Sequence, residues 1–290
     1  MASNMIELIK VLRERTGAGN LDCKKALEAC DMDVEKAVDF LREKGVAKAA
    51  KKASRIAAEG LCDIKVCEKC GRAAIVEVNC ETDFVTRGDL FKKLVTETVE
   101  DVLENNYQSI EEAKEANKER YLSASIAIGE KLDFRRFELV SKAENQIFGT
   151  YIHNGSQIGV IVVAEGLNDE DLLGVAMHIA ANNPSYVCEK CIPADVIEHE
   201  RKIALEGAKQ DPKLAGKPEQ MLMNIVNGKV NKLLGEQVLL NQAYLLNPEV
   251  TVRQLLDEHK AKIVKFVRFA VGEGIEKRQE NFAEEVMKQM

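Results

Sequence analysis

Two copies of the tetrapeptide Cys-Glu-Lys-Cys, at residues 67–70 and 188–191, are the clearest candidates for chemistry in this chain. Two such pairs supply four thiolates, which complete a tetrahedral zinc site if they meet in space. The first pair falls at a predicted hairpin turn, as in zinc knuckles. The pairs are far apart in the sequence, and neither begins a helix in a thioredoxin-like pattern. The default interpretation is inert surface thiols, and the alternative is a cysteine-based zinc or redox protein that uses Cys67, Cys70, Cys188 and Cys191.

The remaining cysteines and the histidines give no catalytic signature. Eight cysteines in 290 residues are too few for a disulfide scaffold, and the N-terminus has no secretion signal, so we expect reduced thiols. The four histidines lie apart without an H-E-x-x-H motif or a nucleophile elbow, and His178 is expected to be structural. No phosphate-binding G-x-x-x-x-G-K-[ST] loop occurs. The sequence therefore predicts a protein that is not an enzyme and that binds no cofactor.

The segment Asn79–Val85, NCETDFV, places an aromatic ring where a loop is expected. It follows an apolar run that is typical of a buried strand and precedes Arg87-Gly88-Asp89, a predicted turn into a helix. Loops held by a rigid strand and helix are where binding residues concentrate. The segment alone leaves two interpretations open: Phe84 folds under its own loop as core, or it is exposed as an apolar wedge beside Asp83.

Length and charge limit the classes of function. A chain of 290 residues exceeds the usual size of one domain, so two or more domains are expected. The formal net charge of −7 argues against direct binding of nucleic acid or of an anionic membrane, since both need a basic surface. The longest apolar run, residues 158–164, is far too short to cross a bilayer. A cytoplasmic protein is expected.

Residues 1–55 predict a small domain of three short helices followed by a basic linker. Thr16-Gly17-Ala18-Gly19 should separate the first two helices, Asp33 should cap the third, and Gly45 should end it. The alanine- and lysine-rich stretch from 46 to 55 then predicts a mobile or helical tether. A domain this small has a marginal hydrophobic core. An apolar patch that remains on its surface therefore indicates a site for docking a partner.

From residue 61 the pattern changes to strands and contains an internal repeat, which predicts an α+β core of two similar subdomains, 56–145 and 146–194 with 236–271. Each copy should hold a three-stranded antiparallel sheet packed against helices. The predicted strands are 61–66, 73–80 and 134–140 in the first copy, and 147–153, 158–164 and 263–271 in the second, with helices near 89–104 and 169–182.

An insertion at 195–235 interrupts the second copy and predicts an antiparallel helical hairpin. Its two apolar stripes are Val196, Ile197 and Ile203, and Leu222, Ile225, Val226 and Leu233. The C-terminal residues 272–290 have apolar residues at roughly helical spacing and predict a helical module that packs on another part of the protein.

Several strings in the chain closely resemble the translation elongation factor Ts family, and they follow the family's order over the whole chain. They are LRERTGAGNLDCKKAL at 12–27, KAAKKASRIAAEG at 48–60, EVNCETDFV at 77–85, HIAANNP at 178–184 and RFAVGEGIEK at 268–277. The resemblance implies a ubiquitin-associated-like first domain, a core of two similar subdomains, an inserted hairpin and a C-terminal helical module. It also implies guanine-nucleotide exchange on the GTPase elongation factor Tu during protein synthesis.

The resemblance also implies residues that contact that partner. In the family, the Asp and Phe of TDFV act on the nucleotide domain of elongation factor Tu, where the Phe inserts between helices and disturbs Mg²⁺ coordination. The matching residues here are Thr82, Asp83, Phe84 and Val85. First-domain contacts map to Arg13, Thr16, Gly17, Ala18, Leu21 and Lys24, and core contacts map to His153, Leu245 and Leu246. Asn20-Leu21 replaces two methionines found in some members, and the CEKC pairs depart from the family's pattern.

Overall fold

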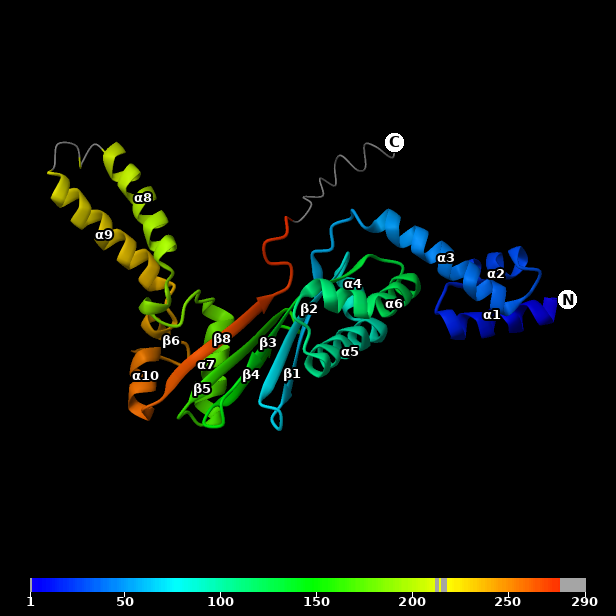
Figure 1. The fold of residues 1–290 in the computed structure, drawn as a ribbon, viewed down its shortest axis with the longest axis horizontal. Helices are drawn as coiled ribbons and strands as arrows, with labels where there is room; N and C mark the ends of the chain where they lie inside the picture. Colours follow the sequence, from blue (N-terminus) through cyan, green and yellow to red (C-terminus); the bar gives the residue numbers. More distant parts are fainter. Residues whose placement is uncertain (1, 212–213, 215–217, 277–290) are drawn as a thin grey trace. The chain divides into compact units, whose positions relative to one another are not determined.

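The computed structural model describes residues 2–211, 214 and 218–276 and combines helices with small sheets, so the α+β prediction is confirmed. The chain divides into two compact units. The first comprises Met1–Ser141, Asn154–Gly159 and Phe269–Met290, and the second comprises Lys142–His153 and Val160–Arg268. Figure 1 follows the chain through the elements of both units. Within the described residues, no helix is long and apolar enough to span a bilayer.

Three helices open the first unit: α1 (Ala2–Thr16), α2 (Asn20–Ala29) and α3 (Val34–Lys52). The break predicted between α1 and α2 is confirmed, and Gly17 adopts φ +67° there, a conformation that suits glycine. The predicted cap of α3 is also confirmed, because Asp33 Oδ1 accepts a hydrogen bond of 3.1 Å from the Lys36 amide. The helices bury a common core of Leu12, Cys23, Ala26, Leu27 and Ala37.

The prediction that Gly45 ends the third helix is wrong. The helix continues to Lys52, through part of the stretch expected to be a tether. Gly45 instead allows a close approach: a Cβ at this position would lie 2.1 Å from Cδ1 of Ile126. Glycine costs a helix only about 1 kcal/mol, and the alanines and lysines that follow favour helix strongly, so the helix persists.

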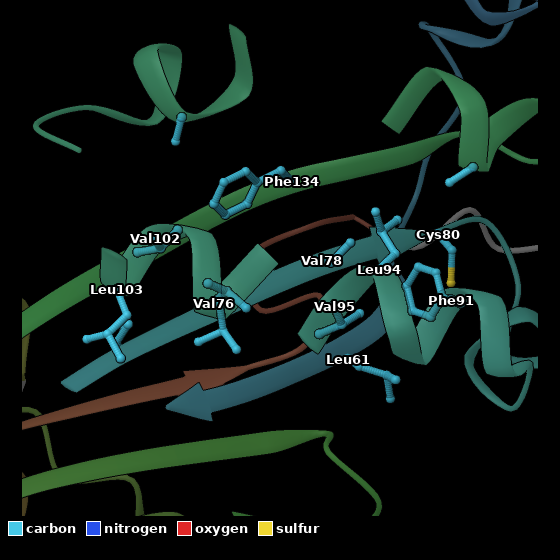
Figure 2. Packing of buried hydrophobic residues seen from close by; sticks show 14 residues of the cluster. Leu61, Val76, Val78, Cys80, Phe91, Leu94, Val95, Val102, Leu103 and Phe134 are labelled. Carbon is cyan, nitrogen blue, oxygen red and sulfur yellow. The ribbon is translucent and has the colours of Figure 1, made fainter. Parts of the chain in front are cut away.

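The first sheet has the strand order β1 (Glu59–Cys67), β2 (Arg72–Cys80), β3 (Leu132–Ser141), all antiparallel, and these bounds confirm the three predicted strands. The short helix α4 (Asp83–Thr86) and the helix α5 (Asp89–Asn105) follow β2. In Figure 2 the apolar side chains of α5 pack onto those of the strands. The residues labelled there are Leu61, Val76, Val78, Cys80, Phe91, Leu94, Val95, Val102, Leu103 and Phe134.

The helix α6 (Ile110–Ile128), which precedes β3, was not predicted. Its apolar residues are sparse, so the periodic signal is weak. Two local signals do mark its ends. The Ser109 side chain accepts a hydrogen bond of 3.2 Å from the Glu112 amide, as an N-cap does, and Gly129 ends the helix at φ +87°.

The second sheet has the order β4 (Ile147–His153), β5 (Ile158–Glu165), β8 (Lys262–Ala270), again as predicted. The helix α7 (Asp169–Asn182) follows β5, as α5 follows β2. A group of short elements lies between α7 and β8 and was not predicted. It consists of two short 3-10 helices, η1 (Glu189–Cys191) and η2 (Leu239–Asn241), the strands β6 (Ala243–Tyr244) and β7 (Asn247–Thr251), and the helix α10 (Val252–His259).

The insertion forms two helices, α8 (Ala194–Gln210) and α9 (Glu219–Glu236), packed against each other. Most of the predicted stripe residues lie in their interface, but Ile203 and Leu233 are exposed, so these two assignments are wrong. Ala204 and Leu234 occupy the interface instead. Adjacent residues on a helix point about 100° apart, so an error of one residue turns a side chain from the interface to solvent. The predicted C-terminal module lies, after Glu276, outside the described residues.

Candidate partner-binding site

The α4 turn exposes Phe84 and partly buries its neighbour Val85. The Phe84 side chain is 77% exposed, so the interpretation of Phe84 as core is wrong. Val85 packs against the core that α5 and the first sheet share. The turn is therefore anchored from below by one apolar side chain while it presents an aromatic ring to solvent. Large exposed aromatic rings on a fixed loop are typical of binding sites.

Glu130 fixes the start of this turn. Its Oε2 accepts hydrogen bonds of 3.0 Å from the amides of both Glu81 and Thr82, and its Oε1 accepts one of 2.6 Å from the Thr82 hydroxyl. A carboxylate that accepts several backbone bonds holds a loop firmly, because charge-assisted hydrogen bonds are stronger than neutral ones. This role of Glu130 was not predicted, because Glu130 follows a helix that was itself not predicted.

Further contacts hold the two sides of the turn. The Glu81 carboxylate accepts a bond of 2.7 Å from the Lys131 amide and pairs with Arg55 at 3.1 Å. On the other side, the Asp83 carboxylate lies 3.5 Å from Arg87, and both side chains are largely exposed. Asp83 is therefore available beside the Phe84 ring, and its local ion pair is of the weak, solvent-exposed kind.

Cys80, the last residue of β2, ties the strand to the turn without being reactive. Its Sγ lies 3.2 Å from the carbonyl oxygen of Thr82, to which the thiol donates. Burial, and then the charge of Glu130, raises the pKa of Cys80 to about 12. The thiolate is the nucleophilic form of cysteine, so this thiol is inert at neutral pH.

The first-domain residues divide into exposed and structural ones. Arg13, Leu21 and Lys24 are exposed, and the Leu21 side chain, at 73%, is one of the most exposed apolar groups of the domain. The turn between α1 and α2 supports them. The Thr16 hydroxyl donates to the Leu12 carbonyl at 2.7 Å, and the Gly17 amide donates to that of Arg13 at 2.8 Å. Ala18 is buried in the domain core, so its side chain supports the turn and offers little surface.

In the second unit, Leu245 and Leu246 connect β6 to β7 and are both exposed, at 41% and 59%. The fully buried His178 of α7 holds this connection. Its Nδ1 accepts a hydrogen bond of 3.1 Å from the Leu245 amide, and its Nε2 lies 2.9 Å from Gln242 Oε1. Burial lowers the pKa of His178, so its ring is neutral at pH 7. The structural role expected for His178 is confirmed, and its connection to Leu245 is new.

His153 ends β4 and is exposed. Its Nδ1 lies 2.9 Å from the hydroxyl of Tyr151, two residues earlier on the same strand, so the two side chains stand on one face. The imidazole therefore has a fixed orientation at the surface of the second unit.

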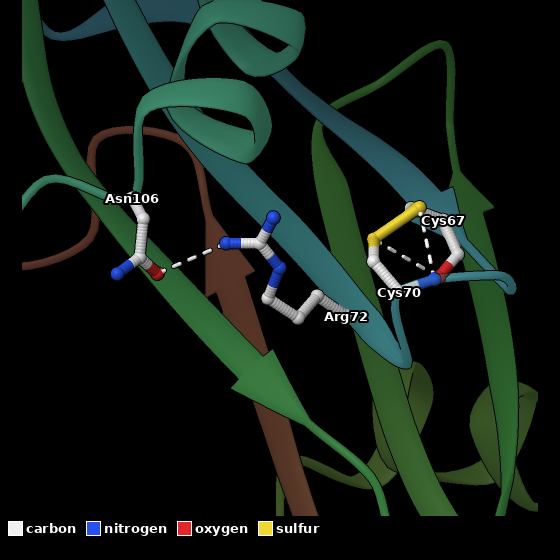
Figure 3. Close-up of a disulfide and its surroundings, with 4 residues drawn as sticks. All are labelled: Cys67, Cys70, Arg72 and Asn106. Carbon is white, nitrogen blue, oxygen red and sulfur yellow. Dashed lines mark hydrogen bonds between the residues drawn. A yellow bond between two sulfur atoms is a disulfide. The ribbon is translucent and has the colours of Figure 1, made fainter.

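The two Cys-Glu-Lys-Cys sequences differ in oxidation state. Cys67 and Cys70 form a disulfide at the tip of the β1–β2 hairpin, which Figure 3 shows beside the Arg72–Asn106 hydrogen bond. The expectation of reduced thiols is therefore wrong for this pair, and the predicted hairpin turn is confirmed. Cys188 and Cys191 are free. Across the part of the chain that the structure describes, no cluster of three or more His, Cys, Asp or Glu side chains is placed to hold a metal ion.

Two thirds of the chain matches a known protein family. The family model of elongation factor Ts matches residues 81–273. The matched region begins at Glu81, so it includes Thr82–Val85 with their anchor Glu130, and it also includes His153, His178, Leu245 and Leu246.

Proposed function

Because the chain belongs to the elongation factor Ts family, whose members are nucleotide exchange factors of translation elongation, we propose that it binds elongation factor Tu and promotes the release of GDP. The observation that carries this proposal is the exposed Phe84 ring on a turn fixed by Glu130. An aromatic side chain held in place before binding pays little entropy when it enters a partner's pocket.

Exchange of this kind needs contacts and no covalent chemistry. A GTPase holds GDP through its phosphate loop and Mg²⁺, so an exchange factor accelerates release by favouring the state in which those contacts are broken. We propose that the Phe84 ring inserts between helices of the nucleotide domain and that Asp83 acts beside it, so that Mg²⁺ coordination is disturbed. Thr82 and Val85 then serve to position the pair. The chain is accordingly proposed to act without catalytic residues or a cofactor.

Three other surfaces add to the contact in this proposal. Arg13, Leu21 and Lys24 offer one exposed apolar group and two exposed cations, which suit an acidic and apolar patch on the nucleotide domain. Leu245 and Leu246 offer an apolar tip for another domain of the partner, and His153 is proposed to face the phosphate-loop side. These side chains are of the kinds that recognise other proteins. The chain is proposed to act in the cytoplasm.

The proposal is tested with elongation factor Tu that has been stripped of nucleotide. The full chain should form a stable complex with it on gel filtration, and added GDP should dissociate the complex. Reciprocity requires the chain to weaken GDP binding by the same factor by which GDP weakens binding of the chain. A chain that forms no complex, or a complex that GDP leaves intact, would contradict the proposed function.

A further inference from the structure

The second Cys-Glu-Lys-Cys sequence, residues 188–191, has no part in the proposed exchange function and, like the first copy, places two cysteines three residues apart in a turn. In the first copy, the sulfur atoms of Cys67 and Cys70 are bonded across a four-residue turn with a Cα–Cα distance of 5.5 Å. In the second copy, the Cys191 amide donates a hydrogen bond of 3.0 Å to the Cys188 carbonyl, which closes a turn of the same length. Such turns bring their end Cα atoms within about 7 Å. Disulfides need about 4.4 to 6.8 Å.

The two cysteines of the second copy are neighbours across this turn. Interaction with the Cys188 side chain is the main reason that the pKa of Cys191 is raised. Cys191 is exposed and Cys188 is half-buried. One thiol of the pair is thus open to a reagent from solvent, while the other lies next to it and is partly shielded.

Contacts hold the backbone before this turn and a side chain within it. The carbonyl of Tyr186 accepts a bond of 2.8 Å from the Leu239 amide, and the Glu189 carboxylate between the two cysteines bonds Arg253 of α10 at 2.9 Å. Arg253 also donates to Asn241 at 3.0 Å. Because the turn is held before reaction, formation of a bond between the sulfurs requires little backbone movement.

The surroundings favour redox chemistry over metal binding. Tetrahedral zinc takes four ligands, and the described residues offer no third His, Cys, Asp or Glu placed with this pair. The nearest carboxylate in sequence, Glu189, is engaged by Arg253. Two adjacent thiols without further ligands can still lose two electrons to a disulfide reagent.

We propose that Cys188 and Cys191 are a reversible redox site that a low-molecular-weight disulfide such as oxidised glutathione converts to a second intrachain disulfide. The exposed Cys191 thiolate attacks one sulfur of the reagent, forms a mixed disulfide and releases one glutathione thiolate. The Cys188 thiolate then attacks the Cys191 sulfur, closes the protein disulfide and releases the second glutathione. Two protons leave the cysteines and two glutathione thiols form, so electrons and atoms balance.

The test uses the full chain, reduced with dithiothreitol, freed of reductant and incubated with oxidised glutathione at alkaline pH, because the raised pKa of Cys191 leaves little of the attacking thiolate at neutral pH. Remaining thiols are alkylated, and peptides are mapped by mass spectrometry without reduction. Cys188 and Cys191 should lose alkylation together, as one crosslinked peptide lighter by two hydrogen atoms, and dithiothreitol should restore both thiols. Persistent alkylation of both residues, or a separate glutathione adduct on each, would overturn the proposal.

The variant Cys188→Ser tests the order of attack, since it removes the resolving thiol and keeps the exposed one. It should accumulate a stable glutathione adduct on Cys191. The half-buried Cys30, which lies in the helical first domain, is the internal reference for a thiol without a partner cysteine. Modification of Cys191 no greater than that of Cys30 in this variant would contradict the assignment of Cys191 as the attacking residue.

Discussion

The exposure of the Phe84 side chain depends on the hydrogen bonds that Glu130 accepts. Phe84 and Val85 are neighbours, yet one is exposed and the other packs into the core, because the Glu130 carboxylate fixes the backbone just before them. Residue type alone could not predict this outcome, since a phenylalanine is more often buried than exposed. The anchor is far along the chain and comes into contact only through the tertiary fold.

Replacing Glu130 by Ala should loosen the turn. The Glu81 and Thr82 amides would lose their acceptor, at a cost of about 1–3 kcal/mol in the free energy of unfolding. Hydrogen exchange at residues 81–88 should quicken, and catalysed GDP release should slow because the ring is no longer held. Glu130→Gln keeps one acceptor oxygen and should lie between the two. A variant with unchanged exchange protection at this turn would contradict the anchoring role.

His178 should make stability depend on pH. Its pKa is lowered by burial, so the unfolded chain takes up a proton at higher pH than the folded chain does. The contribution of His178 to the free energy of unfolding is complete above the ordinary histidine pKa of about 6.5. It is lost as the pH falls from there through the pKa of His178 in the folded chain. Urea denaturation at pH 7.5 and pH 5 should show this loss. His178→Gln, which does not titrate, should reduce the difference, and an equal difference in both proteins would exclude His178 as its source.

Among the elements, α8 of the helical hairpin has some positions that pack against α9 and others that face solvent. Ala208 is 2% exposed and Ile203 is 55% exposed, although isoleucine is the more apolar residue. Ala208→Glu should place a charge in the interface with α9 and destabilise the hairpin by about 2 kcal/mol or more. Ile203→Glu is the matched control and should cost less than about 0.5 kcal/mol. Hydrogen exchange in α8 and α9 measures both, and equal effects would contradict the packing described here.

The elements that sequence reasoning predicted are the ones with strong periodicity. The runs of β2 and β5 are bounded by turn residues and buried along nearly their whole length, so most of their residues are apolar. Elements that depend on specific side-chain bonds were missed. The short β6–β7 pair has few apolar residues and is held from outside by His178, and α6 is marked mainly by its caps. Local patterns cannot reveal such support.

At the scale of a whole unit, Glu77 joins segments that are distant in sequence. It is fully buried in β2, where it bonds Arg135 at 2.8 Å and Arg136 at 2.5 Å, both in β3, and accepts a bond of 2.8 Å from the Gly272 amide. Arg136 also lies over the ring of Phe269, 4.2 Å from its centre. Strands β2 and β3 of the first sheet and the chain after β8 are therefore joined through one buried carboxylate.

Glu77→Ala should destabilise the first unit strongly, by about 3–5 kcal/mol, because two partly buried arginines would lose their partner. The exposed pair of Arg15 and Glu35, at 2.6 Å, provides the control. Glu35→Ala removes a carboxylate with the same kind of partner but in solvent, and should change stability far less than Glu77→Ala does. Thermal and urea denaturation compare the two. Similar costs for both variants would show that burial of Glu77 adds nothing.

Stopped-flow fluorescence measures whether the exposed Phe84 ring accelerates nucleotide release. Elongation factor Tu loaded with fluorescent GDP is mixed with the full chain and excess unlabelled GDP. Phe84→Ala should slow catalysed release about thirtyfold, equivalent to about 2 kcal/mol, and weaken the nucleotide-free complex less. Ile203→Ala, an exposed aliphatic residue on α8, should leave release unchanged. A Phe84→Ala protein that releases GDP as fast as the unaltered chain would contradict the account.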